Sequence, residues 1–139
     1  MFLKIAPDLH HAQIDGIITV SRKHRIDGFI CTNLTKRRDL LKDACPPKGG
    51  ISGKAVEKSS DELISYIHQR AKDFVIIGCG GVFSAEDAYR KIRLGASLIQ
   101  LITGMIYEGP QLISSINAGL VELLRKDGFG TIRDAVGTQ

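Results

Sequence analysis

Tryptophan is absent from the 139 residues of this chain, and aromatic side chains make up only 6% of it. So few rings argue against the aromatic stacking surfaces with which proteins bind single-stranded nucleic acid. No apolar run approaches the ~18 residues that a membrane-spanning helix requires. These shortages favour an ordinary globular chain, in line with a hydrophobic fraction of 43% and a charged fraction of 24%.

Cysteine and histidine are few, and their spacing suggests no metal chemistry. The three cysteines, Cys31, Cys45 and Cys79, include no CxxC pair, and the four histidines lack the spacing of metal ligands. An odd number of cysteines without such pairs argues against a disulfide framework and a structural zinc site. We expect no metal site, and we expect Cys31 and Cys79, which lie in apolar runs, to be buried free thiols.

Four short apolar runs are the main pattern that is present, and they cover residues 2–6, 28–31, 74–77 and 97–102. Continuous runs are typical of strands buried on both faces of a parallel sheet. A segment with helical periodicity follows each run, and start signals for the last three helices come from Ser59 with Glu62, Ser84 and Pro110. The sequence therefore predicts four βα units with right-handed crossovers in one unit, residues 1–139.

Glycine is abundant, with 15 residues, and Gly80 and Gly81 follow the third apolar run. Ligands of parallel α/β folds bind at the carboxyl ends of the strands. Two interpretations of the glycine pair stay open: a backbone that approaches a phosphate, or a tight turn that needs glycine for its conformation alone. In (β/α)8 barrels the phosphate site follows the last two strands, so Gly80, Gly81 and Thr103 favour phosphate binding if these are those strands.

The connection from residue 33 to residue 58 is unusually long and rich in proline and glycine. Long connections of this kind are typically binding loops or lids. Much of the net charge of +4 gathers in it, on Lys36, Arg37, Arg38, Lys42 and Lys48. A nucleic-acid module is one hypothesis for this cluster. We favour a solvated loop and expect no nucleic-acid partner.

Six segments taken together resemble the quinone-dependent (class 2) dihydroorotate dehydrogenases, in family order and spacing: residues 4–9, 26–33, 49–54, 76–82, 91–101 and 127–129. The family fold is a (β/α)8 TIM barrel, and this α/β chain resembles its second half, strands five to eight. The length agrees, because a full barrel needs ~200 residues or more. The resemblance implies an FMN-dependent enzyme that oxidises dihydroorotate to orotate in UMP biosynthesis and passes electrons to ubiquinone.

The resemblance also assigns roles to matched positions. Asn33 and Leu34 fall at positions that bind the orotate ring, and Lys4 at a position that contacts the flavin near the atoms where reduced flavin gathers negative charge. The remaining positions that would hold FMN are Thr32, Ser52, Gly53, Gly80, Gly81, Leu101, Ile102 and Thr103. Two of these residues depart from the family pattern, because Leu34 replaces the usual Thr and Ile102 replaces a common Tyr.

The catalytic base of the class, a serine, is expected upstream of Met1, as are the quinone tunnel and the membrane contact. The resemblance therefore implies a chain that binds FMN and part of the substrate and is inactive when isolated. It places the whole protein at the mitochondrial inner membrane, or at the cytoplasmic membrane of a bacterium. The alternative hypothesis is a non-catalytic flavin- or phosphate-binding half-barrel that dimerises through its open edges.

Overall fold

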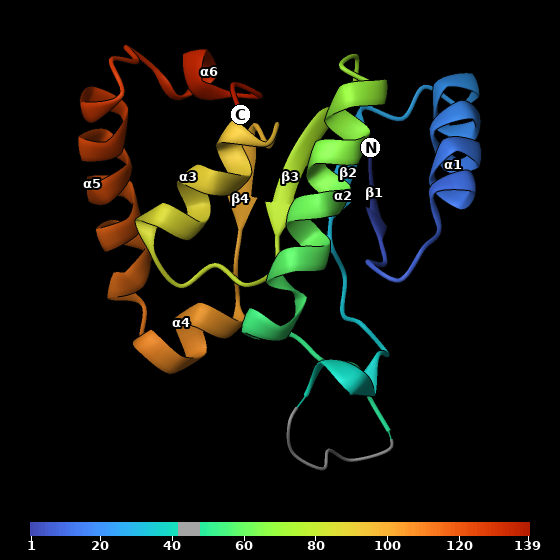
Figure 1. The fold of residues 1–139 in the computed structure, drawn as a ribbon, viewed down its shortest axis with the longest axis horizontal. Helices are drawn as coiled ribbons and strands as arrows, with labels where there is room; N and C mark the ends of the chain where they lie inside the picture. The colour runs from blue at the N-terminus through green and yellow to red at the C-terminus, as the bar shows by residue number, and fades with distance from the viewer. Residues whose placement is uncertain (42–47) are drawn as a thin grey trace.

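The computed structural model describes residues 1–41 and 48–139, and it alternates strands with helices (Figure 1). The strands are β1 (Phe2–Ile5), β2 (Gly28–Cys31), β3 (Val75–Cys79) and β4 (Leu98–Gln100). The helices are α1 (His11–Lys23), α2 (Glu57–Arg70), α3 (Ala85–Arg93), α4 (Thr103–Glu108), α5 (Gln111–Lys126) and α6 (Ile132–Ala135). In the described part of the chain, no helix has the length and apolar character to cross a membrane.

The sheet has the order β1-β2-β3-β4, and every neighbouring pair is parallel. Strands that follow one another in the chain are therefore also neighbours in the sheet. A (β/α)8 barrel has this strand order with helical crossovers, and here the sheet is an open segment of it. The predicted four βα units are confirmed, and the fold is that of part of a (β/α)8 barrel. β1 and β4 form the two edges of the sheet within the described residues.

One face of the sheet carries the core. Ile5, Phe29, Cys31 and Ile76 alternate along their strands onto this face and pack against α1 and α2, where Ile14, Ile18, Leu63, Ile64 and Ile67 are buried. A second cluster joins α3 to α5 through Ala88, Ile92, Leu112, Ile116 and Leu120. This alternation explains why the sequence reads as apolar runs, since each strand turns every second side chain toward the helices.

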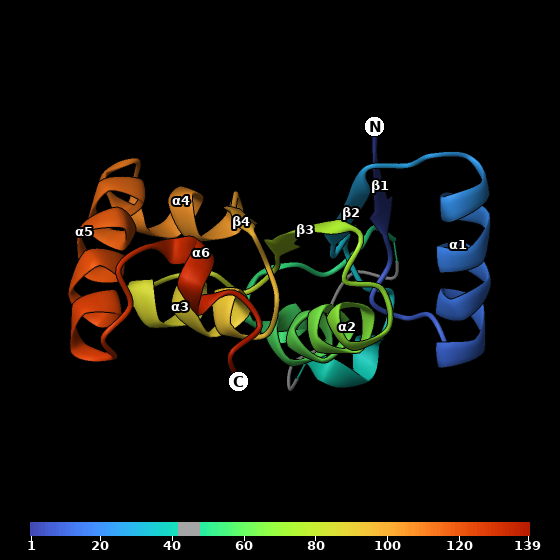
Figure 2. The same cartoon turned by 90° about the horizontal axis from the view of Figure 1, so that it is seen from above.

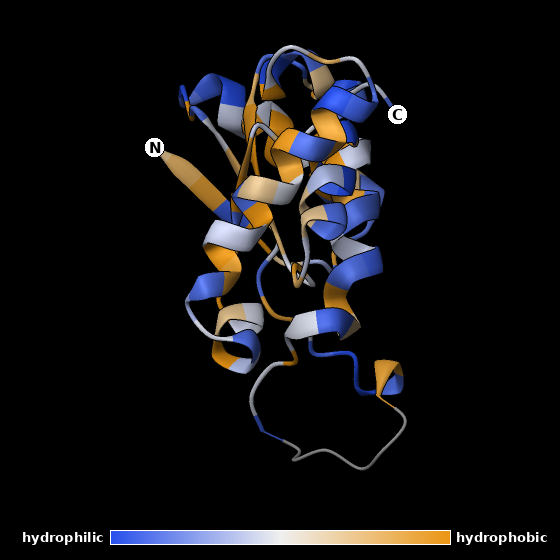
Figure 3. Ribbon diagram, turned by 90° about the vertical axis from the view of Figure 1, so that its left-hand side faces the viewer, coloured by the Kyte–Doolittle hydropathy of each residue, from blue (hydrophilic) through white to orange (hydrophobic). Residues whose placement is uncertain are grey.

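The opposite face of the sheet is open. Figure 2 shows α1, α2 and α3 on one side of the strands and no helix between β1 and β4 on the other. Phe2, Val75 and Leu98, which belong to this face, are 40%, 39% and 58% exposed. In Figure 3 the strand at the N-terminus is coloured as hydrophobic and projects past the helices. In a closed barrel this face is the filled interior.

The long connection after β2 has short structure of its own, which the sequence did not predict. Arg38–Leu40 (η1) and Gly53–Val56 (η2) are 3₁₀ turns, and Thr35 and Ile51 form an isolated antiparallel bridge. Asp8, in the β1–α1 loop, accepts hydrogen bonds from the Thr35 hydroxyl and, at 2.9 Å, from the Lys36 backbone N–H. The connection is thereby fixed at the carboxyl end of the sheet. Lys42 of the predicted basic cluster and Cys45 lie outside the described residues.

Candidate functional site

A pocket opens at the carboxyl ends of the four strands, at the end of the sheet where the sequence placed a ligand. Every predicted site residue lines it except Gly53 and Gly81: Lys4, Thr32, Asn33, Leu34, Ser52, Gly80, Leu101, Ile102 and Thr103. Gly104 also lines it, as expected of the glycine that follows Thr103 at the end of the last strand. Cys79 and Val82 line it too and were not predicted, although each lies within two residues of a predicted glycine in the sequence.

Lys4 supplies the positive charge of the pocket. Its side chain lies on the open face of β1, level with Ile30 and Ile77 of the neighbouring strands. Lys4 is in a regular strand and exposed, and no carboxylate within residues 1–41 and 48–139 forms an ion pair with it. An ammonium group at a pocket mouth is available for an anionic or electron-rich ligand.

Thr32 supplies an unused polar group. It is 2% exposed, and its hydroxyl oxygen has no hydrogen-bond partner among the residues that the structure describes. Its backbone N–H donates to the Cys79 carbonyl oxygen at 2.6 Å, and the Cys31–Thr32 peptide bond is cis. A buried hydroxyl without a partner costs free energy, so a ligand that hydrogen-bonds to it is favoured at this position.

Gly80 and Gly81 both have left-handed backbone conformations, with φ of +121° and +74°. A β-carbon on Gly80 would lie 3.0 Å from Val56, and one on Gly81 would lie 2.4 Å from the Glu57 β-carbon. Conformation and packing alone therefore require glycine here. Their backbone N–H groups have no acceptor within the described part of the chain, so the phosphate interpretation also stays open.

The long connection closes one side of the pocket through Ser52 and Gly53. The Ser52 and Thr103 hydroxyl oxygens are 3.0 Å apart and share a hydrogen bond. Gly53, at φ +77°, approaches Thr103 so closely that a β-carbon would lie 3.1 Å from the Thr103 methyl group. Although Gly53 does not line the pocket itself, it allows the loop to pack against the end of β4. The loop before α2 and the start of α4 thus form one wall.

The cysteine thiols near the pocket are poor nucleophiles. Burial raises the pKa of Cys31 to about 12, and burial also raises the pKa of Cys79. Cys31 is buried, as predicted, whereas Cys79 is only half-buried because it faces the open side of the sheet. The described residues contain no group of three or more His, Cys, Asp or Glu side chains that could hold a metal ion.

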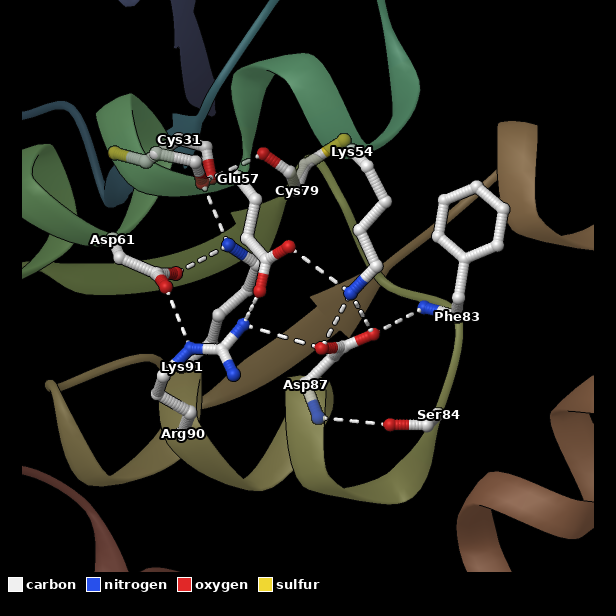
Figure 4. Close-up of polar contacts among 11 residues, drawn as sticks. Cys31, Lys54, Glu57, Asp61, Cys79, Phe83, Ser84, Asp87, Arg90 and Lys91 are labelled. Carbon is white, nitrogen blue, oxygen red and sulfur yellow. Dashed lines mark hydrogen bonds and ion pairs between the residues drawn. The ribbon is translucent and has the colours of Figure 1, made fainter.

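Sequence reasoning missed a network of charged side chains on the helix side of the sheet (Figure 4). It joins α2 to α3 and consists of Lys54, Glu57, Asp61, Asp87, Arg90 and Lys91. Asp87 also accepts a hydrogen bond from the Phe83 backbone N–H at 2.9 Å, and its own N–H donates to the Ser84 hydroxyl at 3.3 Å. The network therefore extends to the capped start of α3, next to the glycine pair.

The sequence and fold were compared with known proteins. A family model described as dihydroorotate dehydrogenase matches residues 1–124. This chain belongs to the dihydroorotate dehydrogenase family. Two curated relatives named dihydroorotate dehydrogenase (quinone), from Natronomonas pharaonis and Nostoc punctiforme, are each 44% identical over 99% and 100% of the chain. A crystal structure of DHODH from Eimeria tenella in complex with ferulenol superposes with a TM-score of 0.92 at 34% identity.

The matches cover this chain almost completely but only part of each relative. The chain spans 39% and 40% of the two curated dihydroorotate dehydrogenases and 37% of the Eimeria chain. It therefore corresponds to well under half the length of these proteins. The family and the partial-barrel fold are established, and the individual site residues remain predictions.

Proposed function

We propose that this chain forms the FMN-binding part, and a portion of the orotate-binding part, of a quinone-dependent dihydroorotate dehydrogenase. The whole enzyme would oxidise dihydroorotate to orotate in pyrimidine biosynthesis and pass the electrons to ubiquinone, at the mitochondrial inner membrane or a bacterial cytoplasmic membrane. The observation that carries the proposal is the pocket, which gathers predicted cofactor and substrate residues from all four strand ends.

The chemistry of the pocket fits FMN in three respects. The Thr32 hydroxyl is buried without a partner among the described residues, so a flavin heteroatom would satisfy it. The Lys4 ammonium group, which has no ion-pair partner among the described residues, favours the negative charge that reduction brings to a flavin. The backbone N–H groups of Gly80 and Gly81 are available for phosphate oxygens. Leu101, Ile102 and Thr103 would complete the phosphate site, with Ser52 and Gly53 on the loop side.

When bound, FMN supplies the acceptor for the hydride that leaves dihydroorotate. Asn33 offers both a donor and an acceptor to the ring amide groups of the substrate and would fix its orientation. Lys4 would hold a positive charge beside the flavin and so stabilise the reduced state. The raised pKa of Cys79 keeps its thiol protonated at neutral pH, which makes it unsuitable as a base.

We expect the proton acceptor to come from outside this pocket, because the resemblance assigns the base to a serine that matches no position of this chain. The Ser52 hydroxyl, which does line the pocket, shares a hydrogen bond with Thr103. We therefore propose that the catalytic base of the whole enzyme is contributed from elsewhere. The purified chain mixed with FMN, dihydroorotate and a quinone analogue is expected to give no turnover. Robust orotate formation, followed by absorbance, would show that this assignment is wrong.

FMN binding by the purified chain tests the proposal directly. Titration is expected to quench flavin fluorescence, and Lys4→Met is expected to weaken binding about tenfold because it removes a charge-assisted contact. Lys23→Met, on the exposed end of α1, makes the same charge change away from the pocket and should bind like the parent chain. A folded parent chain that ignores FMN, or equal losses in both variants, would overturn the proposal.

A second candidate function is favoured by the open face of the sheet. The exposed apolar side chains of β1, β3 and β4, together with the two strands that form sheet edges within the described residues, suit a non-catalytic flavin- or phosphate-binding half-barrel that pairs with a second copy. Size-exclusion chromatography with FMN fluorescence tests this second candidate. A soluble monomer would contradict the second candidate, whereas an FMN-loaded dimer would support it.

A further inference from the structure

Lys91 on α3 is the most deeply buried charged side chain of the network, with no exposed surface. Its ammonium group donates to the Asp61 carboxylate at 2.5 Å (Figure 4). It also donates to the Ser60 hydroxyl oxygen at 3.1 Å. Burial lowers the pKa of Lys91 and raises that of Asp61, because both charges have lost their water. A buried lysine costs free energy unless it is paired, so its two contacts call for an explanation beyond packing.

Ser60 on α2 connects this lysine to the sheet. Its hydroxyl donates toward the Cys79 carbonyl oxygen at 2.9 Å and toward the Cys31 carbonyl oxygen at 3.2 Å. Cys79 and Cys31 are the last residues of β3 and β2. One buried side chain thus holds the carboxyl ends of both central strands.

The direction of the hydrogen bonds follows from the chemistry of the two groups. An ammonium group has donors only, so at the Lys91–Ser60 contact the lysine must donate and the serine oxygen must accept. The single hydrogen of the hydroxyl is then free to point only away from Lys91, toward the two strand carbonyls. Lys91 therefore orients the Ser60 hydroxyl, and it does so without touching the pocket.

The two carbonyl groups lie immediately before residues of the pocket. Cys31 precedes Thr32, and Cys79 precedes Gly80. The Cys79 carbonyl oxygen also accepts the Thr32 backbone N–H at 2.6 Å, so the two strand ends are tied to each other. The Ser60 side chain is in close contact with Gly80, because a β-carbon there would lie 3.4 Å from the Ser60 β-carbon.

We propose that Lys91 and Ser60 are positioning residues, which lock the ends of β2 and β3 so that the Thr32 hydroxyl and the Gly80 N–H are aligned for the cofactor. This proposal rests on the proposed function, since FMN is the ligand that those two groups would hold. Lys91 acts through Ser60, and Ser60 acts through the strand carbonyls.

The test uses Lys91→Met, which keeps the methylene chain without its charge, and Ser60→Ala, which removes only the hydroxyl. Arg90→Met is the matched control, because Arg90 contacts Glu57, Asp61 and Asp87 in the same network but not the strand ends. Amide chemical shifts and hydrogen exchange at Thr32 and Gly80 are measured by NMR without ligand. FMN affinity is measured by fluorescence quenching at a temperature where circular dichroism shows every variant folded.

Lys91→Met and Ser60→Ala are expected to shift the Thr32 and Gly80 amides, to speed Thr32 exchange and to weaken FMN binding about tenfold. Arg90→Met should lower the melting temperature, but it should leave the Thr32 and Gly80 amide measurements and the FMN affinity close to those of the parent chain. Equal effects in all three variants would show that Lys91 and Ser60 contribute only to general stability, and would overturn the proposal. Should Lys91→Met fail to fold, Ser60→Ala decides alone. If the parent chain binds no FMN, the proposed function fails, while the amide measurements still decide whether this pair fixes the strand ends.

Discussion

Leu34 stands at a position where the family resemblance leads us to expect threonine. Its side chain lines the pocket, is half exposed, and lies so close to Gly50 that a β-carbon at residue 50 would approach its Cβ to 2.6 Å. Glycine at residue 50 lets the loop pass this close to residue 34, and because the contact is to a β-carbon, a threonine at residue 34 would need it as well. An apolar side chain here offers no hydrogen bond to a polar ring, so the departure bears on substrate affinity rather than on folding.

Replacing Leu34 with threonine is expected to tighten orotate binding to the FMN-loaded chain by about three- to tenfold, since one hydrogen bond is gained. Leu34→Val is the matched control because valine has nearly the shape of threonine without its hydroxyl. Isothermal titration with orotate measures both variants. The interpretation is wrong if valine improves binding as much as threonine does.

The thiols give a second prediction at the scale of the residue. With a pKa of about 12 in the fold against 9.0 in the unfolded chain, Cys31 has far less reactive thiolate at pH 8. Iodoacetamide is therefore expected to alkylate Cys31 on the order of 10³ times more slowly in the native chain than in urea. Peptide mass spectrometry at timed intervals measures the rates. Native labelling as fast as in urea would contradict the burial.

At the scale of the element, the glycines divide into those that the fold requires and those that it tolerates. Gly81→Ala is expected to destabilise the chain by ~1–3 kcal/mol, because φ is +74° and the new methyl group would collide with Glu57. Gly16→Ala, within α1 and with no atom within 4 Å of the new methyl group, should stabilise it by ~1 kcal/mol. Urea unfolding measures both, and a destabilising Gly16→Ala would count against this explanation.

The starts of the helices show which helix boundaries can be predicted from local sequence signals. Ser84 caps α3 as predicted, because its hydroxyl accepts the Asp87 N–H within one turn of chain. Ser59 was expected to start the second helix, but this was wrong. α2 begins at Glu57, directly after the 3₁₀ turn that packs against the glycine pair. α4, which begins at the expected site residue Thr103, was not predicted, since it is too short to show a helical period.

At the scale of the whole molecule, the open sheet face should govern solution behaviour. We expect the isolated chain to associate at micromolar concentration, and Leu98→Lys to reduce association by placing a charge on the inner face of an edge strand. Val121→Lys, similarly exposed on α5, is the control for the added charge. Light scattering coupled to size-exclusion chromatography reports the mass. A monomeric parent chain, or equal effects of the two lysines, would refute this expectation.

The sequence alone determined the four βα units, and its resemblance to the family named most of the residues that line the pocket. Apolar runs, caps and strand ends are local signals, and parallel topology brings Lys4, Asn33, Gly80 and Thr103 to one edge whatever the details of packing. Only the tertiary structure decided that the Thr32 hydroxyl has no partner in the part of the chain that the structure describes, and that Lys91 reaches the strand carbonyls through Ser60. The physical reason is that these contacts join residues distant in the chain, and a side chain loses its water only when separate elements pack around it.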